Sequence, residues 1–127
     1  SGKKVAVLGL TFKPGTDDLR DGPALTNVPI LIDDGAELFA WDPIGEKNFR
    51  KQIPEGITYC EKIEDALKDA DICFIFTEWE AIKAFPPSQF KCLMKSPIVL
   101  DGRNCFNPDT MRAEGIEYAS IGRPSRQ

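Results

Sequence analysis

The sequence predicts an α/β fold with an open, mostly parallel sheet that carries helices on both faces, in three layers. Short apolar runs alternate with helical patterns along the whole chain, which is typical of a parallel sheet wound through crossover helices. The chain has 127 residues, of which 42% are hydrophobic and 28% are charged. One domain with a buried core accounts for this length and composition, so we expect residues 1–127 to form a single domain.

Six short apolar runs predict the strands. The first run is continuous and is closed by Gly9, as buried parallel strands usually are. The predicted strands span residues 4–9, 37–41, 57–59, 71–77, 97–100 and 118–121. The run at 71–77 is the most apolar of the six, so we expect this strand at the centre of the sheet.

Helical patterns fill the segments between these runs. The first helix starts at Pro23, a residue suited to a first turn, and stops near Gly35. Pro29 lies inside this helix and removes one of its hydrogen bonds, so we expect a kink or a break there. The last helix follows Asn107, a good N-cap, and stops at Gly115. The other predicted helices span residues 45–51, 63–68, 79–85 and 87–94. The complete pattern is that of a Rossmann-like fold.

The composition limits the chemistry that this chain can perform. It contains no histidine, which excludes Ser-His-Asp catalysis, Cys-His catalysis and His-ligated metal sites within it. We expect no catalytic residue and no metal site here. The 20 acidic and 16 basic residues give a net charge of −4, which argues against binding to nucleic acid or to an anionic membrane. No apolar run approaches the roughly 18 residues of a membrane-spanning helix.

The four cysteines form no CxxC pair, which disfavours a zinc ribbon or a thioredoxin-like site. Cys73 lies in the most apolar run and Cys92 in a helical stretch, and we expect both to pack in the core. Cys105 follows a polar motif and is of more interest. Reduced thiols in a chain without a secretion signal indicate the cytoplasm.

The loop after the first strand is where an α/β sheet of this kind would bind a ligand. Only Gly9 of a GxGxxG fingerprint is present, and no Gly-Lys-Ser/Thr occurs, so neither an independent NAD site nor a P-loop is predicted. Phe12 offers an aromatic face, and Lys13 offers a point charge suited to phosphate. The alternative is that Phe12 packs in the core and Lys13 is solvated.

Two arginines lie in loops that follow predicted strands. Arg20 belongs to a charged run before the first helix, where it either faces an anionic ligand or joins a local Arg-Asp network. Arg103 follows Asp101 and Gly102, where its guanidinium can grip phosphate or ribose hydroxyls. The alternative for Arg103 is an ion pair with Asp101 or a neighbouring carboxylate. Gly102 favours the ligand role because glycine permits a close backbone approach.

These loops carry sequence that resembles a known family. VAVLGLTFKPGTDDLR at residues 5–20 resembles the opening of the C-terminal UDP-binding domain of the UDP-glucose/GDP-mannose dehydrogenase family. Later landmarks agree in order and spacing; they are AWDP at 40–43, FTEW at 76–79, LDGRN at 100–104 and IGR at 121–123. The resemblance covers nearly the whole chain and is strongest to the UDP-glucose 6-dehydrogenase branch. In that family the first helix is uninterrupted, whereas this chain has Pro29.

The resemblance implies roles for individual residues. The Phe-Lys pair of the first loop and the arginine of the Asp-Gly-Arg segment contact the UDP-sugar in the family, so Phe12, Lys13 and Arg103 are candidate substrate-binding residues. The arginine that ends the first-loop motif lies near NAD, so Arg20 is a candidate cofactor contact. NAD itself is bound mainly by an N-terminal domain outside this chain. A central helical domain and the catalytic cysteine also precede the UDP-binding domain.

The implied function is the UDP-sugar-binding part of an NAD-dependent dehydrogenase that oxidises UDP-glucose in two steps to UDP-glucuronate, for polysaccharide biosynthesis. Because the chain starts without Met, we expect it to be part of a longer protein and to be inactive alone. The resemblance allows a homodimer of the intact enzyme. Two alternatives stay open. One is the same domain from a UDP-N-acetylmannosamine or GDP-mannose dehydrogenase, and the other is a stand-alone nucleotide-binding module.

Overall fold

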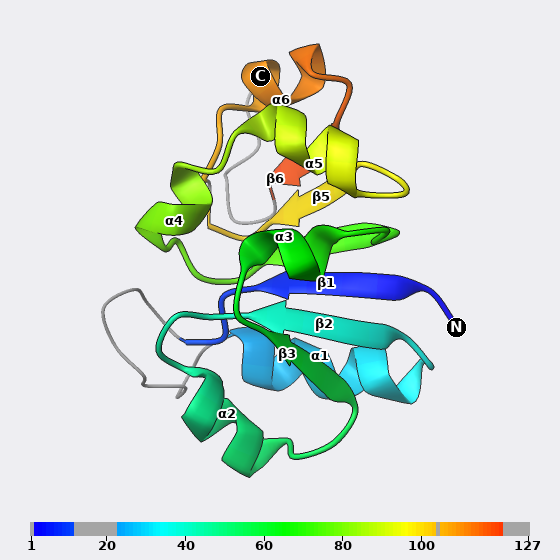
Figure 1. Ribbon diagram of the computed structural model, residues 1–127, viewed down its shortest axis with the longest axis vertical. Coiled ribbons are helices and arrows are strands. Elements are labelled where there is room, and N and C mark those ends of the chain that lie inside the picture. The colour runs from blue at the N-terminus through cyan, green and yellow to red at the C-terminus, as the bar shows by residue number, and fades with distance from the viewer. Residues whose placement is uncertain (1, 12–22, 104, 121–127) are drawn as a thin grey trace.

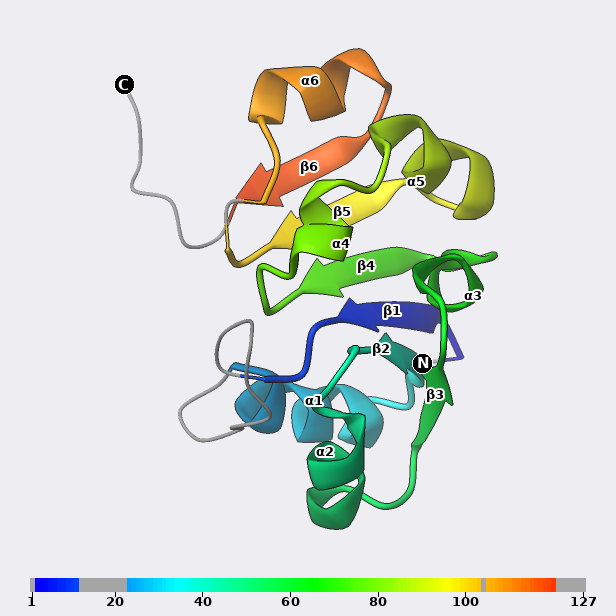
Figure 2. The same ribbon diagram turned by 60° about the vertical axis from the view of Figure 1, so that its left-hand side comes forward.

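The computed structural model describes residues 2–11, 23–103 and 105–120, which form a six-stranded sheet with helices on both faces (Figures 1 and 2). The strands are β1 (Lys4–Leu8), β2 (Glu37–Trp41), β3 (Ile57–Cys60), β4 (Ile72–Ile75), β5 (Ile98–Asp101) and β6 (Glu117–Ser120). The helices are α1 (Pro23–Asp33), α2 (Glu46–Gln52), α3 (Ile63–Leu67), α4 (Glu80–Lys83), α5 (Pro87–Leu93) and α6 (Pro108–Ala113). The predicted α/β class and the alternation of elements are confirmed.

All strand pairs are parallel, and the strand order is β3-β2-β1-β4-β5-β6. The run predicted at the centre, β4, lies beside β1 in the middle of the sheet. Leu8 of β1 is in register with Trp41 of β2 and with Ile75 of β4. Ile75 is in turn in register with Asp101 of β5. Four strands therefore end level with one another, and the strand order reverses between β1 and β4.

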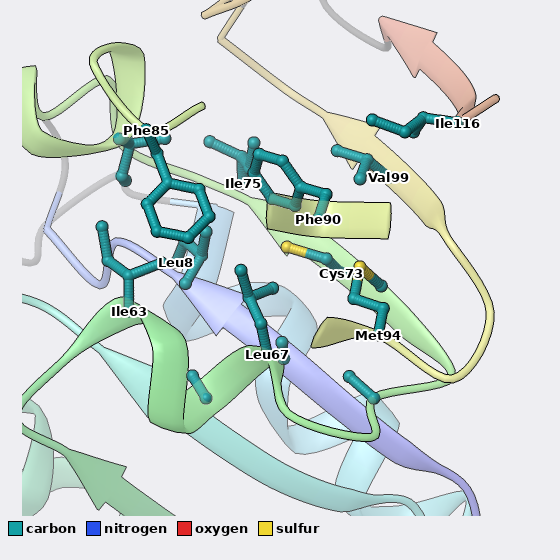
Figure 3. Close-up of a cluster of buried hydrophobic side chains, with 14 of the residues drawn as sticks. Leu8, Ile63, Leu67, Cys73, Ile75, Phe85, Phe90, Met94, Val99 and Ile116 are labelled. Carbon is teal, nitrogen blue, oxygen red and sulfur yellow. The ribbon is translucent and has the colours of Figure 1, made fainter. Parts of the chain in front are cut away.

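The alternation of side chains along β1 divides the core into two clusters. Ala6 and Leu8 belong to a cluster with buried residues of α3, α4, α5 and α6, whereas Val5 and Val7 belong to one with α1 and α2. This is the two-residue period of a strand that is buried on both faces. Figure 3 shows the first cluster, in which the ring of Phe90 of α5 packs edge-on against the ring of Phe85. The sheet is thus the middle of three layers.

Helix α1 runs without a break from Pro23 to Asp33 and contains Pro29. The predicted start at Pro23 is confirmed, and the predicted break at Pro29 is wrong. Pro29 is exposed, so its ring lies at the surface of the helix and displaces no core side chain. The N-cap of α6 is also confirmed, because the Asn107 side chain accepts from the backbone N–H groups of Asp109 and Thr110.

The cysteine predictions are half right. Cys73 is completely buried, as expected. Cys92 is exposed, so the expectation that it packs in the core is wrong. Helix α5 turns Phe90 inward, and Cys92 lies two residues further on, toward solvent. A helical period places residues i and i+2 on different faces, which explains the outcome.

None of the helices in the described part of the chain combines the length and the apolar character needed to cross a membrane.

Candidate functional site

The carboxyl ends of β1, β2, β4 and β5 form one edge of the sheet, and backbone hydrogen bonds continue past the strands there. Gly9 N–H donates to the Trp41 carbonyl at 2.8 Å, and Phe76 N–H donates to the Leu8 carbonyl at 2.9 Å. The segments that follow β1, β2 and β4 are therefore still side by side when the strands end. In a doubly wound sheet this edge, at the point where the strand order reverses, is the usual ligand site.

Gly9 turns the chain out of β1 at a place where no other residue fits. Its φ is +91°, a conformation that other residues rarely adopt, and a Cβ there would lie 2.5 Å from the Thr77 Cβ. The same Cβ would lie 2.6 Å from the Thr77 backbone nitrogen. Thr77 therefore packs directly against the backbone at Gly9, which keeps the start of the segment after β1 close to the segment after β4.

Asp42, directly after β2, is the main organiser of this edge. Its side chain is buried, and its Oδ1 accepts from the N–H groups of Ile44 at 2.9 Å and Gly45 at 2.6 Å. Its Oδ2 accepts from the Leu10 N–H at 2.7 Å and from the indole N–H of Trp79 at 3.0 Å. Both oxygens are therefore used, and the segments after β1, β2 and β4 meet at one carboxylate.

Thr77 supplies the second contact to the segment after β1. Its hydroxyl donates to the Thr11 carbonyl at 2.5 Å, and both residues are fully buried. The two residues before Phe12 are thus held at the Leu10 N–H by Asp42 and at the Thr11 carbonyl by Thr77.

Arg103 leans from the end of β5 toward β4. Its Nε donates to the Phe76 carbonyl at 3.0 Å and lies 3.7 Å from a carboxylate oxygen of Glu78. Its side chain is 27% exposed, so it is accessible from the carboxyl edge. The predicted alternative of an ion pair is present with Glu78. Asp101 instead accepts from the Arg103 backbone N–H at 2.8 Å.

Gly102 does permit a close approach, but to the neighbouring strand. Its N–H donates to the Ile75 carbonyl at 2.9 Å, and a Cβ at Gly102 would lie 3.2 Å from that oxygen. The glycine beside Arg103 therefore extends the β4–β5 ladder. It carries less weight as a sign of ligand binding than the sequence suggested.

Asp101 organises the loop that carries Arg103. It is completely buried, and its Oδ2 accepts from the Tyr118 hydroxyl at 2.6 Å and from the Cys105 N–H at 2.7 Å. With the bond from the Arg103 N–H, this carboxylate fixes the backbone on both sides of residue 104. A carboxylate that accepts several N–H and O–H bonds can remain buried without a cationic partner.

The thiols near this edge are unsuited to nucleophilic attack. Burial, followed by the nearby carboxylates of Asp101 and Glu78, raises the pKa of Cys105 to about 12. Burial likewise raises the pKa of Cys73 far above its usual range. Both thiols stay protonated at neutral pH, and a protonated thiol is a poor nucleophile. Within residues 2–11, 23–103 and 105–120, no three potential metal-binding side chains are grouped together.

Of the predicted site residues, the structure places Arg103 at the carboxyl edge. Phe12, Lys13 and Arg20 lie outside the described residues. Asp42 and Thr77, which hold the segment that leads to Phe12, were not among the predicted site residues. Their positions could have indicated a role, because both are polar residues that follow a strand. Asp42 is the first residue after β2, and Thr77 is the second residue after β4.

The strand order and the polar groups gathered where it reverses define a Rossmann-like α/β domain. The family model described as "UDP-glucose/GDP-mannose dehydrogenase family, UDP binding domain" matches residues 6–108, and the chain belongs to this family.

Curated relatives and solved structures agree with this membership. The chain is 46% identical to the UDP-glucose 6-dehydrogenase of Rhizobium meliloti (strain 1021) and 42% identical to UDP-glucose 6-dehydrogenase YwqF of Bacillus subtilis (strain 168), in each case over 97% of this chain. It spans only 28% of the length of either relative. The structure of UDP-D-ManNAc dehydrogenase from Pyrococcus horikoshii matches 97% of this chain and 26% of that chain, with a TM-score of 0.75 and 28% identity.

Proposed function

We propose that this chain is the C-terminal, UDP-sugar-binding domain of a larger NAD-dependent UDP-glucose 6-dehydrogenase. The observation that carries the proposal is the identity of 42–46% with two UDP-glucose 6-dehydrogenases across nearly the whole chain. The organised edge between β1 and β4 supports it, because the segment leading to Phe12 and Lys13 and the loop of Arg103 both start from that edge.

In this proposal Phe12, Lys13 and Arg103 bind the UDP-sugar. Lys13 supplies a point charge for the diphosphate, and Arg103 supplies planar donors for phosphate or ribose oxygens. The ion pair with Glu78 keeps the Arg103 side chain over the end of β4. Because that pair is partly exposed and 3.7 Å long, its strength is modest and an anionic ligand can compete with it.

The remaining machinery lies elsewhere in the intact protein. NAD is bound mainly by an N-terminal domain, with Arg20 as a contact from this chain, and a central helical domain joins the two. The intact enzyme oxidises the C6 alcohol of UDP-glucose to the carboxylate of UDP-glucuronate. Its nucleophilic cysteine is outside this chain, which is inactive alone. The raised pKa of Cys105 supports a nucleophile outside this chain, because a protonated thiol is a poor nucleophile.

We further propose a cytoplasmic, homodimeric enzyme that serves polysaccharide biosynthesis and interacts with neither nucleic acid nor membranes. The net charge of −4 supports the last part, since anionic polymers and surfaces repel an acidic protein. Lys13 and Arg103 together can still attract the diphosphate of a UDP-sugar.

A second candidate differs only in the sugar. The structural likeness to a UDP-D-ManNAc dehydrogenase favours the same domain acting on UDP-N-acetylmannosamine. The higher identity to UDP-glucose 6-dehydrogenases favours glucose.

Turnover by the full-length protein distinguishes these substrates. NADH formation should be measured with UDP-glucose, UDP-N-acetylmannosamine and GDP-mannose at equal concentrations. We expect UDP-glucose to be the preferred substrate and to yield two NADH for each sugar oxidised. Preference for either of the other sugars would replace the proposed substrate, and turnover of none of them would overturn the dehydrogenase assignment.

A further inference from the structure

We propose that Asp42 is a positioning residue for the UDP-sugar, which it never needs to touch. Its carboxylate holds the start of the loop that leads into Phe12 and Lys13. This inference rests on the proposed function, because it assigns those two residues to the substrate.

The two oxygens of Asp42 perform separable tasks. Oδ1 accepts from Ile44 and Gly45, two and three residues further along the chain. Asn107 makes the same local pattern with a single amide oxygen, accepting from the N–H groups two and three residues ahead. The local turn after β2 therefore needs only one acceptor. The second oxygen of Asp42 is surplus to that turn.

The second oxygen, Oδ2, binds the backbone at the start of the loop after β1. It accepts from the Leu10 N–H, 32 residues away, and from the Trp79 indole. Leu10 is completely buried, so water cannot replace the acceptor if it is lost. A buried N–H without a partner is costly, and the backbone at Leu10 would shift to regain one.

The peptide that follows is held from the other side by Thr77, which donates to the Thr11 carbonyl. Phe12 comes directly after this twice-held segment. A change in the path of residues 10 and 11 therefore changes the point from which Phe12 and Lys13 start. A shift of about 1 Å in a positioning contact is enough to lower binding or turnover markedly.

Asp42→Asn tests the proposal because the asparagine can do only the local task. Its oxygen can serve Ile44 and Gly45, as Asn107 does in its own turn, whereas its amide NH₂ would face the donors of Leu10 and Trp79. We expect the Leu10 amide and the Trp79 indole N–H to lose protection from hydrogen exchange, while Ile44 and Gly45 keep it. We expect UDP affinity of the 127-residue chain to fall about tenfold.

Met111→Ala provides the matched control. Met111 is a completely buried residue of α6, and α6 contacts β6, at the opposite end of the strand order from β2. This variant therefore lowers the melting temperature without removing a contact of Asp42. It should retain the affinity of the unmodified chain for UDP. If Asp42→Asn fails to fold, Asp42→Ser replaces it, since a hydroxyl can accept within the local turn but is too short to reach Leu10.

The outcomes separate this inference from the proposed function. If the unmodified chain binds UDP and Asp42→Asn binds it equally well, Asp42 has no positioning role. An affinity loss in Met111→Ala equal to that in Asp42→Asn also overturns the inference, because the effect then follows stability. If the unmodified chain does not bind UDP, the proposed function fails and the role of Asp42 fails with it.

Discussion

Trp79 donates its indole N–H to Oδ2 of Asp42 at 3.0 Å, from the segment after β4 to the residue after β2. Strand β1 lies between β2 and β4, so the bond passes over the carboxyl end of β1. The same oxygen accepts from the Leu10 N–H. One buried carboxylate thus joins the segments that follow β1, β2 and β4 at the edge where a ligand is expected.

Replacing Trp79 by phenylalanine should lower the free energy of unfolding by about 1–3 kcal/mol, because a bond to a buried carboxylate is lost. Trp41→Phe is the matched control, since Trp41 donates to the neutral Glu61 carbonyl at 3.2 Å. Urea denaturation of both variants measures the difference. Stability of Trp79→Phe equal to that of the unmodified chain would contradict the importance of the Asp42 bond.

Gly9→Ala should destabilise the chain by about 3 kcal/mol or more, or prevent folding. The Cβ would meet Thr77, and φ would remain positive. Gly2→Ala separates these causes, because Gly2 also has a positive φ, of 75°, but has nothing within 4 Å of the added atom. Thermal unfolding of both variants gives the comparison. Equal stability losses would show that the contact with Thr77 is unimportant.

Arg103→Ala should weaken UDP binding by about 1–3 kcal/mol, the range for a hydrogen bond to a charged group. Arg112→Ala is the control, since Arg112 is an exposed arginine on α6 whose ion pair with Asp109 is 3.9 Å long. Calorimetric titration with UDP should show no change for the control. Unchanged affinity in Arg103→Ala would return Arg103 to a structural role at the end of β4.

The cysteines should react in an order set by exposure and by pKa. At pH 8 a thiol reagent should label Cys92 rapidly, because it is exposed, while completely buried Cys73 stays protected. The pKa of Cys105 is raised to about 12, so its thiolate becomes abundant only as the pH approaches that value. Mass spectrometry of labelled peptides checks the order. Rapid labelling of Cys105 at pH 8 would contradict its raised pKa.

Patterning along the chain predicted the fold well because the strands in the middle of the sheet had to be apolar on both faces. The continuous runs at β1 and β4 could be recognised without knowing their neighbours. The helix at Pro29 was harder to predict, since the cost of proline depends on whether the free carbonyl faces water. Cys92 was misplaced because a single residue in a short helix does not define which face is buried.

The site could be predicted only in part, for a physical reason. Arg103 follows a strand and carries a charge, so position and chemistry both marked it. Asp42 acts on Leu10, which lies 32 residues earlier, and only the parallel pairing of β1 with β2 brings them together. The position of Asp42 after a strand marks it as a candidate, but the residues around it do not reveal that its partner is Leu10.

Calorimetric titration of the 127-residue chain with UDP and, separately, with GDP tests directly whether this chain binds UDP. We expect saturable binding of one UDP per chain, weaker binding of GDP, and loss of affinity in a Lys13→Ala/Arg103→Ala variant that remains folded. Absence of saturable UDP binding, or equal or tighter binding of GDP, would contradict this expectation.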